Sequence, residues 1–215
     1  MLVIRLRRST KHLEATPRQT PRSTTAESFL DAAERLLVEI GHASISTRRL
    51  AAEAEANQGL VHYYFGSMDE LFVQVLERFT ERLVARQREM YAADVPFIEK
   101  WRTAWRFQQD DLEAGYSRIW MELQALSWSR PELRPRVAHV NAEWRGVLRE
   151  AFTHAAEEYG LDQDEVPVEA LVAMTMTFAQ GYAIERLEGI YEGHAELLDW
   201  IERWLEGLEA NRGTP

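Results

Sequence analysis

The chain of 215 residues contains no cysteine. Disulfide frameworks, thiolate metal sites and cysteine nucleophiles are therefore excluded, and the composition suits a reducing compartment. A long hydrophobic run is also missing, because the longest weakly polar stretch, 170–179, is about half as long as a bilayer-spanning helix. Leu2, Val3 and Ile4 form too short an apolar stretch for a signal peptide. We expect a cytoplasmic protein with no membrane partner.

Several catalytic signatures are absent as well. The sequence has no Gly-x-Ser-x-Gly nucleophile elbow and no Walker-type phosphate loop. Glu150, His154 and Glu158 share one helix face that could bind a metal, but di-iron bundles use paired Glu-x-x-His motifs. The single copy, Glu39 to His42, falls at a predicted helix end. We interpret the face as a solvated helix surface and predict no enzyme activity, no metal and no cofactor.

Charge is distributed unevenly along the chain, although its sum is -10. Through Phe65 there are nine basic residues against seven acidic ones, and the remainder has 16 against 28. The first 25 residues hold six basic groups against Glu14 alone. A basic N-terminal region followed by an acidic remainder suits a protein that presents one end to nucleic acid, although acidity also favours solubility.

Helical periodicity begins near Thr25. Five apolar residues recur at helical spacing on one face of the first predicted helix: Phe29, Ala33, Leu36, Leu37 and Ile40. Thr24 and Glu27 form a capping-box pattern at its start, and Gly41 suits its end. The preceding segment, 1–24, lacks this period. It is either a flexible basic arm or the result of a start codon placed too far upstream.

The rest of the chain also has a helical pattern. Beyond the motif described next, helices are predicted at 67–91, 97–113, 116–128, 132–159, 167–190 and 194–210, with Pro and Gly residues at the breaks. No alternating pattern is long enough to indicate a strand. The predicted fold class is all-α, with a small three-helix N-terminal domain over 25–66 and a larger helical body over 67–215.

The segment from Ile45 to Leu71 carries the most specific pattern. Ser46 is a suitable N-cap, and the short helix that follows it, through Ala54, would bury Leu50. A tight turn then leads to a second short helix. Two short helices joined in this way form a helix-turn-helix, whose second helix can enter the major groove of DNA.

The second short helix has an inner and an outer face. Asn57 is a favoured N-cap, and Val61 and Phe65 face inward. On the outer face, Gln58 can read base edges and Gly59 lets the backbone approach DNA closely. The predicted DNA-facing residues are Thr47, Arg48, Gln58, Gly59, Leu60, His62, Tyr63 and Tyr64.

This segment resembles the N-terminal signature of the TetR family of transcriptional regulators. The matching residues are Ser46 (or Thr47), Leu50, Ala51, Ala54, Gly59, Val61, Tyr64, Phe65, Ser67 and Leu71. The resemblance is specific over 25–75 and architectural elsewhere, and the stretches 120–123 and 130–134 look like the family's junction between helices six and seven. It implies a ligand-responsive regulator that binds operator DNA as a homodimer, most simply a repressor released from a palindromic operator by a small-molecule effector.

Three residues depart from that signature. Glu55 stands where the family usually has glycine in a left-handed turn, at a cost of about 1 kcal/mol. Met68 replaces a usual lysine and His62 a usual tyrosine, so at least one phosphate contact is missing. These changes bear on the affinity and sequence of the operator.

The resemblance also implies that helices five to eight enclose the effector pocket and that the last two helices pair across the dimer axis. The predicted pocket residues are Trp101, Trp105, Trp120, Met121, Gln124, Trp128, Met174 and Phe178. The predicted dimer-interface residues are Leu171, Gly181, Tyr182, Leu197, Ile201, Trp204, Leu205 and Leu208. Either set could instead be core, since such stripes often are. We expect a hydrophobic or aromatic effector.

Two alternatives remain open. An activator is possible, because the outcome depends on where the operator lies relative to the promoter. The chain could also be a helical protein-interaction module with a degenerate DNA-binding head, an interpretation favoured by Glu55, Met68 and the acidic body. Only an operator binder should lose affinity steeply with salt, because phosphate contacts release counterions.

Overall fold

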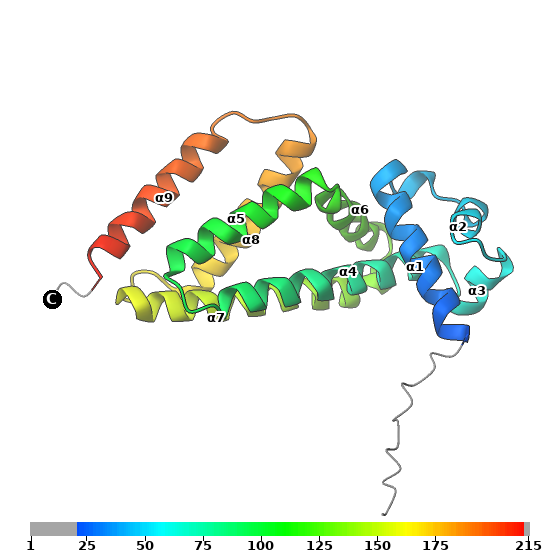
Figure 1. Cartoon of the computed structure of the whole chain (residues 1–215), viewed down its shortest axis with the longest axis horizontal. Coiled ribbons are helices and arrows are strands. Elements are labelled where there is room, and N and C mark those ends of the chain that lie inside the picture. The colour runs from blue at the N-terminus through cyan, green and yellow to red at the C-terminus, as the bar shows by residue number, and fades with distance from the viewer. Residues whose placement is uncertain (1–20, 213–215) are drawn as a thin grey trace, which may run out of the picture.

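The structure is a computed structural model that describes residues 21–212. It is built from helices, and that range contains no strand (Figure 1). The α-helices are α1 (Pro21–Ile40), α2 (Thr47–Glu53), α3 (Gly59–Phe65), α4 (Met68–Tyr91), α5 (Phe97–Glu113), α6 (Tyr116–Ser129), α7 (Arg134–Tyr159), α8 (Val168–Leu187) and α9 (His194–Ala210). The predicted all-α fold class is confirmed.

The beginning of α1 differs from the prediction. The helix starts at Pro21, so Thr24 lies inside it, where its carbonyl oxygen accepts a hydrogen bond from the Ser28 hydroxyl at 2.9 Å. The capping box of Thr24 and Glu27 is therefore wrong. The remainder of the predicted arm over 1–24 lies outside the described residues.

Two later helices are shorter than predicted. α7 begins at Arg134 and not at the predicted residue 132, because Pro131–Leu133 forms a separate 3₁₀ turn. α8 ends three residues before position 190, and Gly189 then takes a left-handed φ of 79°. Glycine adopts this conformation at little cost, which suits it to a helix end.

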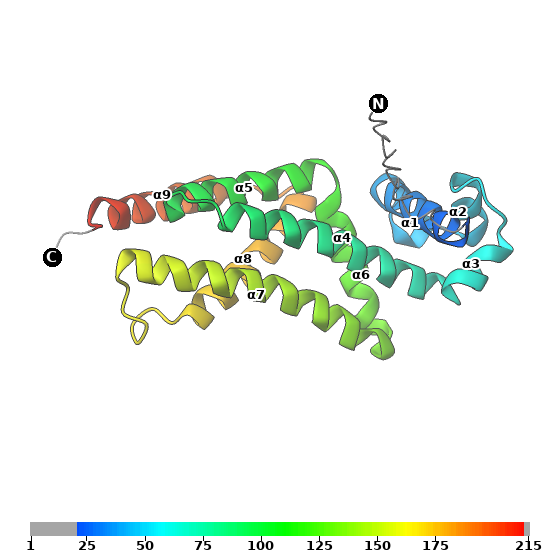
Figure 2. The ribbon, with the colours of Figure 1, turned by 60° about the horizontal axis from the view of Figure 1, so that its bottom comes forward.

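The helices form an elongated molecule with a head of α1, α2 and α3 at one end (Figures 1 and 2). α4 runs from the head along the body, and α7 packs against both α4 and α8. α6 lies where head and body meet and contacts α1 and α4. α9 packs on α5, and its C-terminal end lies at the opposite end of the molecule from α3.

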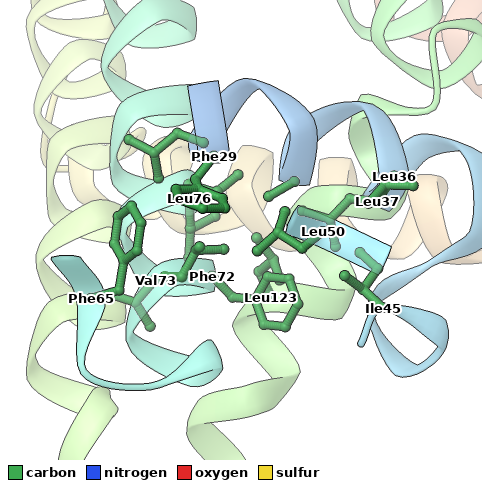
Figure 3. Close-up of a cluster of buried hydrophobic side chains, with 14 of the residues drawn as sticks. Phe29, Leu36, Leu37, Ile45, Leu50, Phe65, Phe72, Val73, Leu76 and Leu123 are labelled. Atoms are coloured by element: carbon green, nitrogen blue, oxygen red, sulfur yellow. The ribbon is translucent and has the colours of Figure 1, made fainter. Parts of the chain in front are cut away.

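A continuous buried cluster joins the head to the body (Figure 3). Phe29 of α1 meets the ring of Phe65 of α3 edge-on, with ring centroids 6.2 Å apart. Leu76 of α4 and Leu123 of α6 are fully buried in the same cluster. Burial of each such side chain contributes about 1.5–3 kcal/mol. The first half of α4 and one face of α6 are therefore part of the head's core, and the domain division at residue 66 stays a prediction.

Two smaller buried clusters hold the body together. One joins α5, α7 and α9 around Phe97, Ala155 and Leu205, and the other joins α7 and α8 around Leu148 and Val172. Every helix of the part that the structure describes is too short or too polar to span a lipid bilayer.

Candidate nucleic-acid interface and ligand cavity

The first helix of the predicted motif, α2, begins as the sequence indicates. The Ser46 hydroxyl accepts a hydrogen bond from the backbone N–H of Arg49 at 3.2 Å, which confirms Ser46 as the N-cap. Leu50 and Ala51 are buried in the head core. The opposite face leaves Arg48 and Arg49 exposed.

The turn after α2 places Glu55 in the left-handed region, with a φ of 51°. Glu55 is the only residue other than glycine with a positive φ in the described range. The backbone N–H groups of Glu55 and Ala56 donate to the carbonyl oxygens of Ala52 at 3.3 Å and Ala51 at 3.0 Å, and so close the end of the helix. The left-handed turn predicted at Glu55 is confirmed.

α3 is the second helix of the motif and begins at Gly59. The Asn57 side-chain oxygen accepts a hydrogen bond from the Gly59 N–H at 2.8 Å, so the predicted capping by Asn57 occurs, although Gln58 directly precedes the helix. Val61 and Phe65 are buried on the inner face, as predicted.

The residues predicted to face DNA divide into two groups. Five are exposed: Arg48, Gln58, Gly59, His62 and Tyr63. Thr47 is half-buried at the start of α2. Leu60 and Tyr64 are half-buried and pack against the head core, so their side chains contribute to the fold.

Local contacts orient two of the exposed side chains. The His62 ring nitrogen Nδ1 lies 3.0 Å from the carbonyl oxygen of Gly66, to which it donates when protonated. Tyr63 is 60% exposed, and its ring meets that of Tyr64 edge-on at 5.1 Å. The rings of His62 and Tyr63 therefore have a preferred orientation on the outer face of α3.

Positive charge is available on the head. Arg48 and Arg49 make no ion pair with any residue of the described range, whereas Arg35 of α1 pairs with Glu53 at 2.8 Å. A guanidinium without a carboxylate partner is suited to bind phosphate, because its donors form a planar fork. Arg49 is absent from the predicted DNA-facing set, although its place beside Arg48 in the exposed first turn of α2 could have indicated it.

Two arginines connect the beginning of α4 to the start of α7. Arg130 donates from Nε to the Asp69 carboxylate at 2.6 Å, and Arg136 pairs with both Glu70 and Glu77. The hydrogen bond to Glu77 is the main cause of the raised pKa of Arg136. Because α4 follows α3 almost directly, these ion pairs fix the helix that carries α3 against the body.

Helices α4 to α9 enclose a cavity of about 630 Å³. Six of the eight predicted pocket residues line it: Trp101, Trp105, Trp120, Met121, Met174 and Phe178. Trp105 stacks on Phe178 with ring centroids 5.6 Å apart and meets Tyr182 edge-on at 4.6 Å. A cavity of this size and apolar character is typical of sites for small organic molecules.

Two predicted pocket residues do not line the cavity, which corrects the sequence-based expectation. The Gln124 side-chain oxygen accepts a hydrogen bond from the Asn141 amide at 2.7 Å, between α6 and α7. Trp128 is 76% exposed near the end of α6. α6 lines the cavity only as far as Met121, so residues farther along the helix lie beyond the cavity.

Several residues of the cavity wall are absent from the predicted pocket set, including Trp144 and Trp200. Asp111 is also absent from it; its carboxylate accepts two hydrogen bonds from Arg86 of α4, at 3.1 and 2.6 Å. Burial raises the pKa of Asp111, and the hydrogen bonds from Arg86 partly oppose that effect. Trp144 could have been found, because α7 is one of the helices expected around the pocket. No pattern in the sequence indicates that Asp111 would line the cavity.

The residues predicted for the dimer interface do not form one surface. Tyr182 and Leu205 are 2% and 3% exposed, so they pack within their own chain, which corrects their assignment. The apolar stripe of each helix is wide enough to cover an inner and an outer face. Five others line the cavity: Leu171, Leu197, Ile201, Trp204 and Leu208. Gly181 is exposed, and an added Cβ would meet no atom within 4 Å.

Large apolar side chains are nevertheless exposed on α8 and α9. They are Met174, Ile184, Leu187, Leu197, Trp200 and Trp204. Sequence periodicity could not separate these residues from their buried neighbours, because both kinds lie in the same broad stripes.

Residues 29–75 match the family model described as bacterial regulatory proteins, tetR family. A helix-turn-helix transcriptional regulator of Haemophilus influenzae is 26% identical over 141 residues, which cover 63% of this chain and 70% of that protein. A helix-turn-helix transcriptional repressor of Mycobacterium tuberculosis is 36% identical over 76 residues, which cover 35% of this chain and 40% of that protein.

The similarity in fold extends over most of the chain. The solved structure of the fatty acid degradation regulator FadR from Bacillus halodurans has a TM-score of 0.68, with 17% sequence identity. The match covers 87% of this chain and 96% of that one. At this level of identity, the similarity concerns the fold and not the ligand.

Proposed function

Because this chain belongs to the TetR family of bacterial regulatory proteins, we propose that it is a transcriptional repressor that releases its operator when it binds a small molecule. One observation carries this proposal. α4 packs into the head core up to Leu76 and lines the cavity from Phe79 onward. α6 does both with different faces, since Ile119 and Leu123 are in the head core and Ser117 and Met121 line the cavity. A molecule in the cavity therefore contacts the same helices that hold α3. The relatives are regulators of transcription and not enzymes.

The exposed face of α3 supports DNA binding. Placed in a major groove, Gln58 can hydrogen-bond to a base edge and Tyr63 can reach a phosphate. Arg48 and Arg49, without carboxylate partners in the described range, add two groups suited to the DNA backbone. We include Arg49 with the eight residues predicted to face DNA. The repressor binds the operator through these groups and loses affinity as salt rises.

A homodimer supplies the two heads that a palindromic operator needs. The exposed apolar residues of α8 and α9 support these helices as the contact surface, because burying them against a second copy removes apolar area from water. Gly181 on the outer face of α8 allows a partner helix to approach closely.

Effector binding acts through α4 and α6. The ligand needs only to bind a conformation with altered head spacing more tightly than the operator-bound one, and DNA is then released. Trp120 of α6 and Phe178 of α8 both line the cavity. Replacing either by alanine should weaken the response to an inducer.

The test of the repressor proposal is a gel shift with DNA from upstream of the protein's own gene and excess nonspecific competitor. We expect a discrete complex of the size of a dimer that disappears in Tyr63→Ala. The matched control is Tyr191→Ala, since Tyr191 is a comparably exposed tyrosine (59%) between α8 and α9. This variant should bind DNA like the unmodified protein.

The outcomes separate the two functional classes. If neither the upstream DNA nor a genome-wide operator selection gives a specific complex, the repressor proposal is wrong and the interaction-module alternative takes its place. If binding occurs but the Tyr63→Ala and Tyr191→Ala variants behave alike, the DNA face has been assigned to the wrong side of the head.

A further inference from the structure

We propose that the effector is a lipophilic cation, which is a bulky aromatic or apolar molecule that carries a positive charge. It binds in the cavity that helices α4 to α9 enclose. The regulatory meaning of this inference rests on the proposed function, but the binding itself can be measured without DNA. Three features of this region favour a cationic ligand: the aromatic cavity wall, the single charged side chain in that wall, and the acidic cavity beside it.

Tryptophan dominates the cavity wall. Six of the seven tryptophans line it: Trp101, Trp105, Trp120, Trp144, Trp200 and Trp204. Indole rings attract cations to their faces more strongly than the rings of tyrosine or phenylalanine do. A wall of this kind offers an apolar ligand burial and a cationic one additional attraction.

The charged groups of the wall have one sign. Among the lining residues in 21–212, Asp111 is the only Asp, Glu, Lys, Arg or His. Its partner Arg86 is not part of the wall, and the Arg86 guanidinium lies over the Phe107 ring at 4.3 Å from the centroid. The ion pair therefore presents its acid to the cavity and keeps its base behind the wall.

Arg86 only partly offsets the unfavourable burial of the Asp111 carboxylate. Burial raises its pKa even though Arg86 donates two hydrogen bonds to it. A second positive charge brought close by a ligand would favour the ionised carboxylate. An anionic ligand would instead lose its hydration in a cavity whose lining residues, within the described range, include no cationic side chain.

A second cavity adjoins the first and is acidic. It has a volume of about 330 Å³ and shares Phe178 and Leu197 with the larger cavity. Its lining includes Glu185, Glu192, Tyr182 and His194, with His194 Nε2 lying 2.6 Å from the Glu185 carboxylate. Negative potential at this side, together with the acidic body, would concentrate cations near the aromatic cavity.

The test compares tetraphenylphosphonium with tetraphenylborate, two ions of nearly the same size and shape and opposite charge. Quenching of tryptophan fluorescence in the full-length protein reports cavity occupancy, because six of the seven tryptophans line the cavity. We expect the phosphonium to bind about tenfold more tightly or better. Because the two ions expose nearly the same apolar area, a cavity that selected only for apolar area would bind them with about equal affinity.

Two variants test the role of the ion pair in opposite directions. Asp111→Asn removes the only full charge from the wall and leaves Arg86 unopposed, so phosphonium affinity should fall about tenfold and borate affinity should rise. Arg86→Gln leaves Asp111 unopposed and should tighten phosphonium binding. Asp110→Asn is the matched control, because Asp110 is the exposed neighbour outside the wall and carries the same charge.

Thermal unfolding followed by circular dichroism shows which variants are folded. If Asp111→Asn does not fold, the comparison of the two ions on the unmodified protein and the Arg86→Gln variant decide the question. Equal affinities for the two ions, tighter borate binding, or a folded Asp111→Asn variant with unchanged phosphonium affinity would overturn the proposal. Phosphonium binding without any operator complex would leave the cavity assignment in place and refute the repressor function, so the two failures are distinguishable.

Discussion

Glu122 of α6 accepts a hydrogen bond of 2.5 Å from the backbone N–H of His42, in the turn that follows α1. Arg118, one turn earlier on α6, donates from Nε to the other oxygen of the same carboxylate at 2.6 Å. Gly41 leaves room for this pair, because a Cβ at Gly41 would collide with the Arg118 guanidinium. Glu122 directly follows Met121 of the cavity wall and is one hydrogen bond from the head.

Removing that carboxylate should weaken communication between the cavity and the head. We expect Glu122→Ala to bind inducer normally, since Glu122 does not line the cavity, but to reduce the effect of saturating inducer on operator affinity by about fivefold. The measurement is the ratio of operator dissociation constants with and without inducer. Glu132→Ala, at an exposed acid just before α7, should leave the ratio unchanged. A normal ratio in Glu122→Ala would exclude this contact as a route of coupling.

Glycine at position 55 should stabilise the protein. Glu55 has a φ of 51°, a conformation that costs a residue with a Cβ about 1 kcal/mol. Glu55→Gly removes that cost, and the free energy of unfolding in urea should rise accordingly. Glu55→Ala keeps the Cβ and removes only the charge, so it should not show the gain. An equal rise in both variants would attribute the effect to the carboxylate instead of the backbone.

An arginine at position 181 should prevent the proposed dimer from forming without unfolding the chain. Gly181 lies within α8 with no atom within 4 Å of an added Cβ, and arginine favours helix over glycine by about 1 kcal/mol. A second copy packed on α8 would meet the new side chain. Light scattering after size exclusion should therefore show a monomer for Gly181→Arg, whereas His154→Arg, at an exposed site on α7, should remain dimeric. A dimeric Gly181→Arg would place the interface elsewhere.

Alkaline pH should loosen the contact between α7 and α9. The Tyr159 hydroxyl donates to the Glu209 carboxylate at 3.0 Å, and burial followed by this hydrogen bond raises the pKa of Tyr159 from 10.0 to about 12. The folded state holds the proton more tightly than the unfolded chain. The stabilising contribution is therefore complete below pH 10 and is lost as the pH rises through 12.

Ultraviolet absorbance of tyrosinate provides the measurement. Tyr159→Phe should lose a late-titrating component, and its free energy of unfolding should depend less on pH in the same range. Tyr191→Phe, at an exposed tyrosine, should keep that component. A late component that survives in Tyr159→Phe would mean that another buried tyrosine, such as Tyr91, accounts for it; burial also raises the pKa of Tyr91.

Local chemistry explains which parts of the fold the sequence could predict. Ser46 caps α2, Asn57 caps the start of α3 and Glu55 takes the left-handed turn, all of which depend on neighbouring residues. α1 starts at Pro21, before the start that Thr24 and Glu27 predict. Proline is itself favoured in the first turn of a helix, where its missing N–H costs nothing.

The cavity and the interface depend on which helix faces meet, and periodicity does not contain that information. Trp128 has the same residue type as Trp120, but lies beyond the point where α6 leaves the cavity. Tyr182 is in an apolar stripe and turns inward onto Trp105. The pairing of Arg86 with Asp111 joins two helices, and no spacing in the sequence could have indicated it.

Trp200 and Trp204 line the cavity and remain 59% and 43% exposed in the single chain. If a second copy covers α8 and α9, it buries the same side chains that an effector would contact. Self-association and effector binding are then thermodynamically linked, and each changes the equilibrium constant of the other by the same factor. The amount of inducer needed to switch the gene would therefore depend on how much repressor the cell makes.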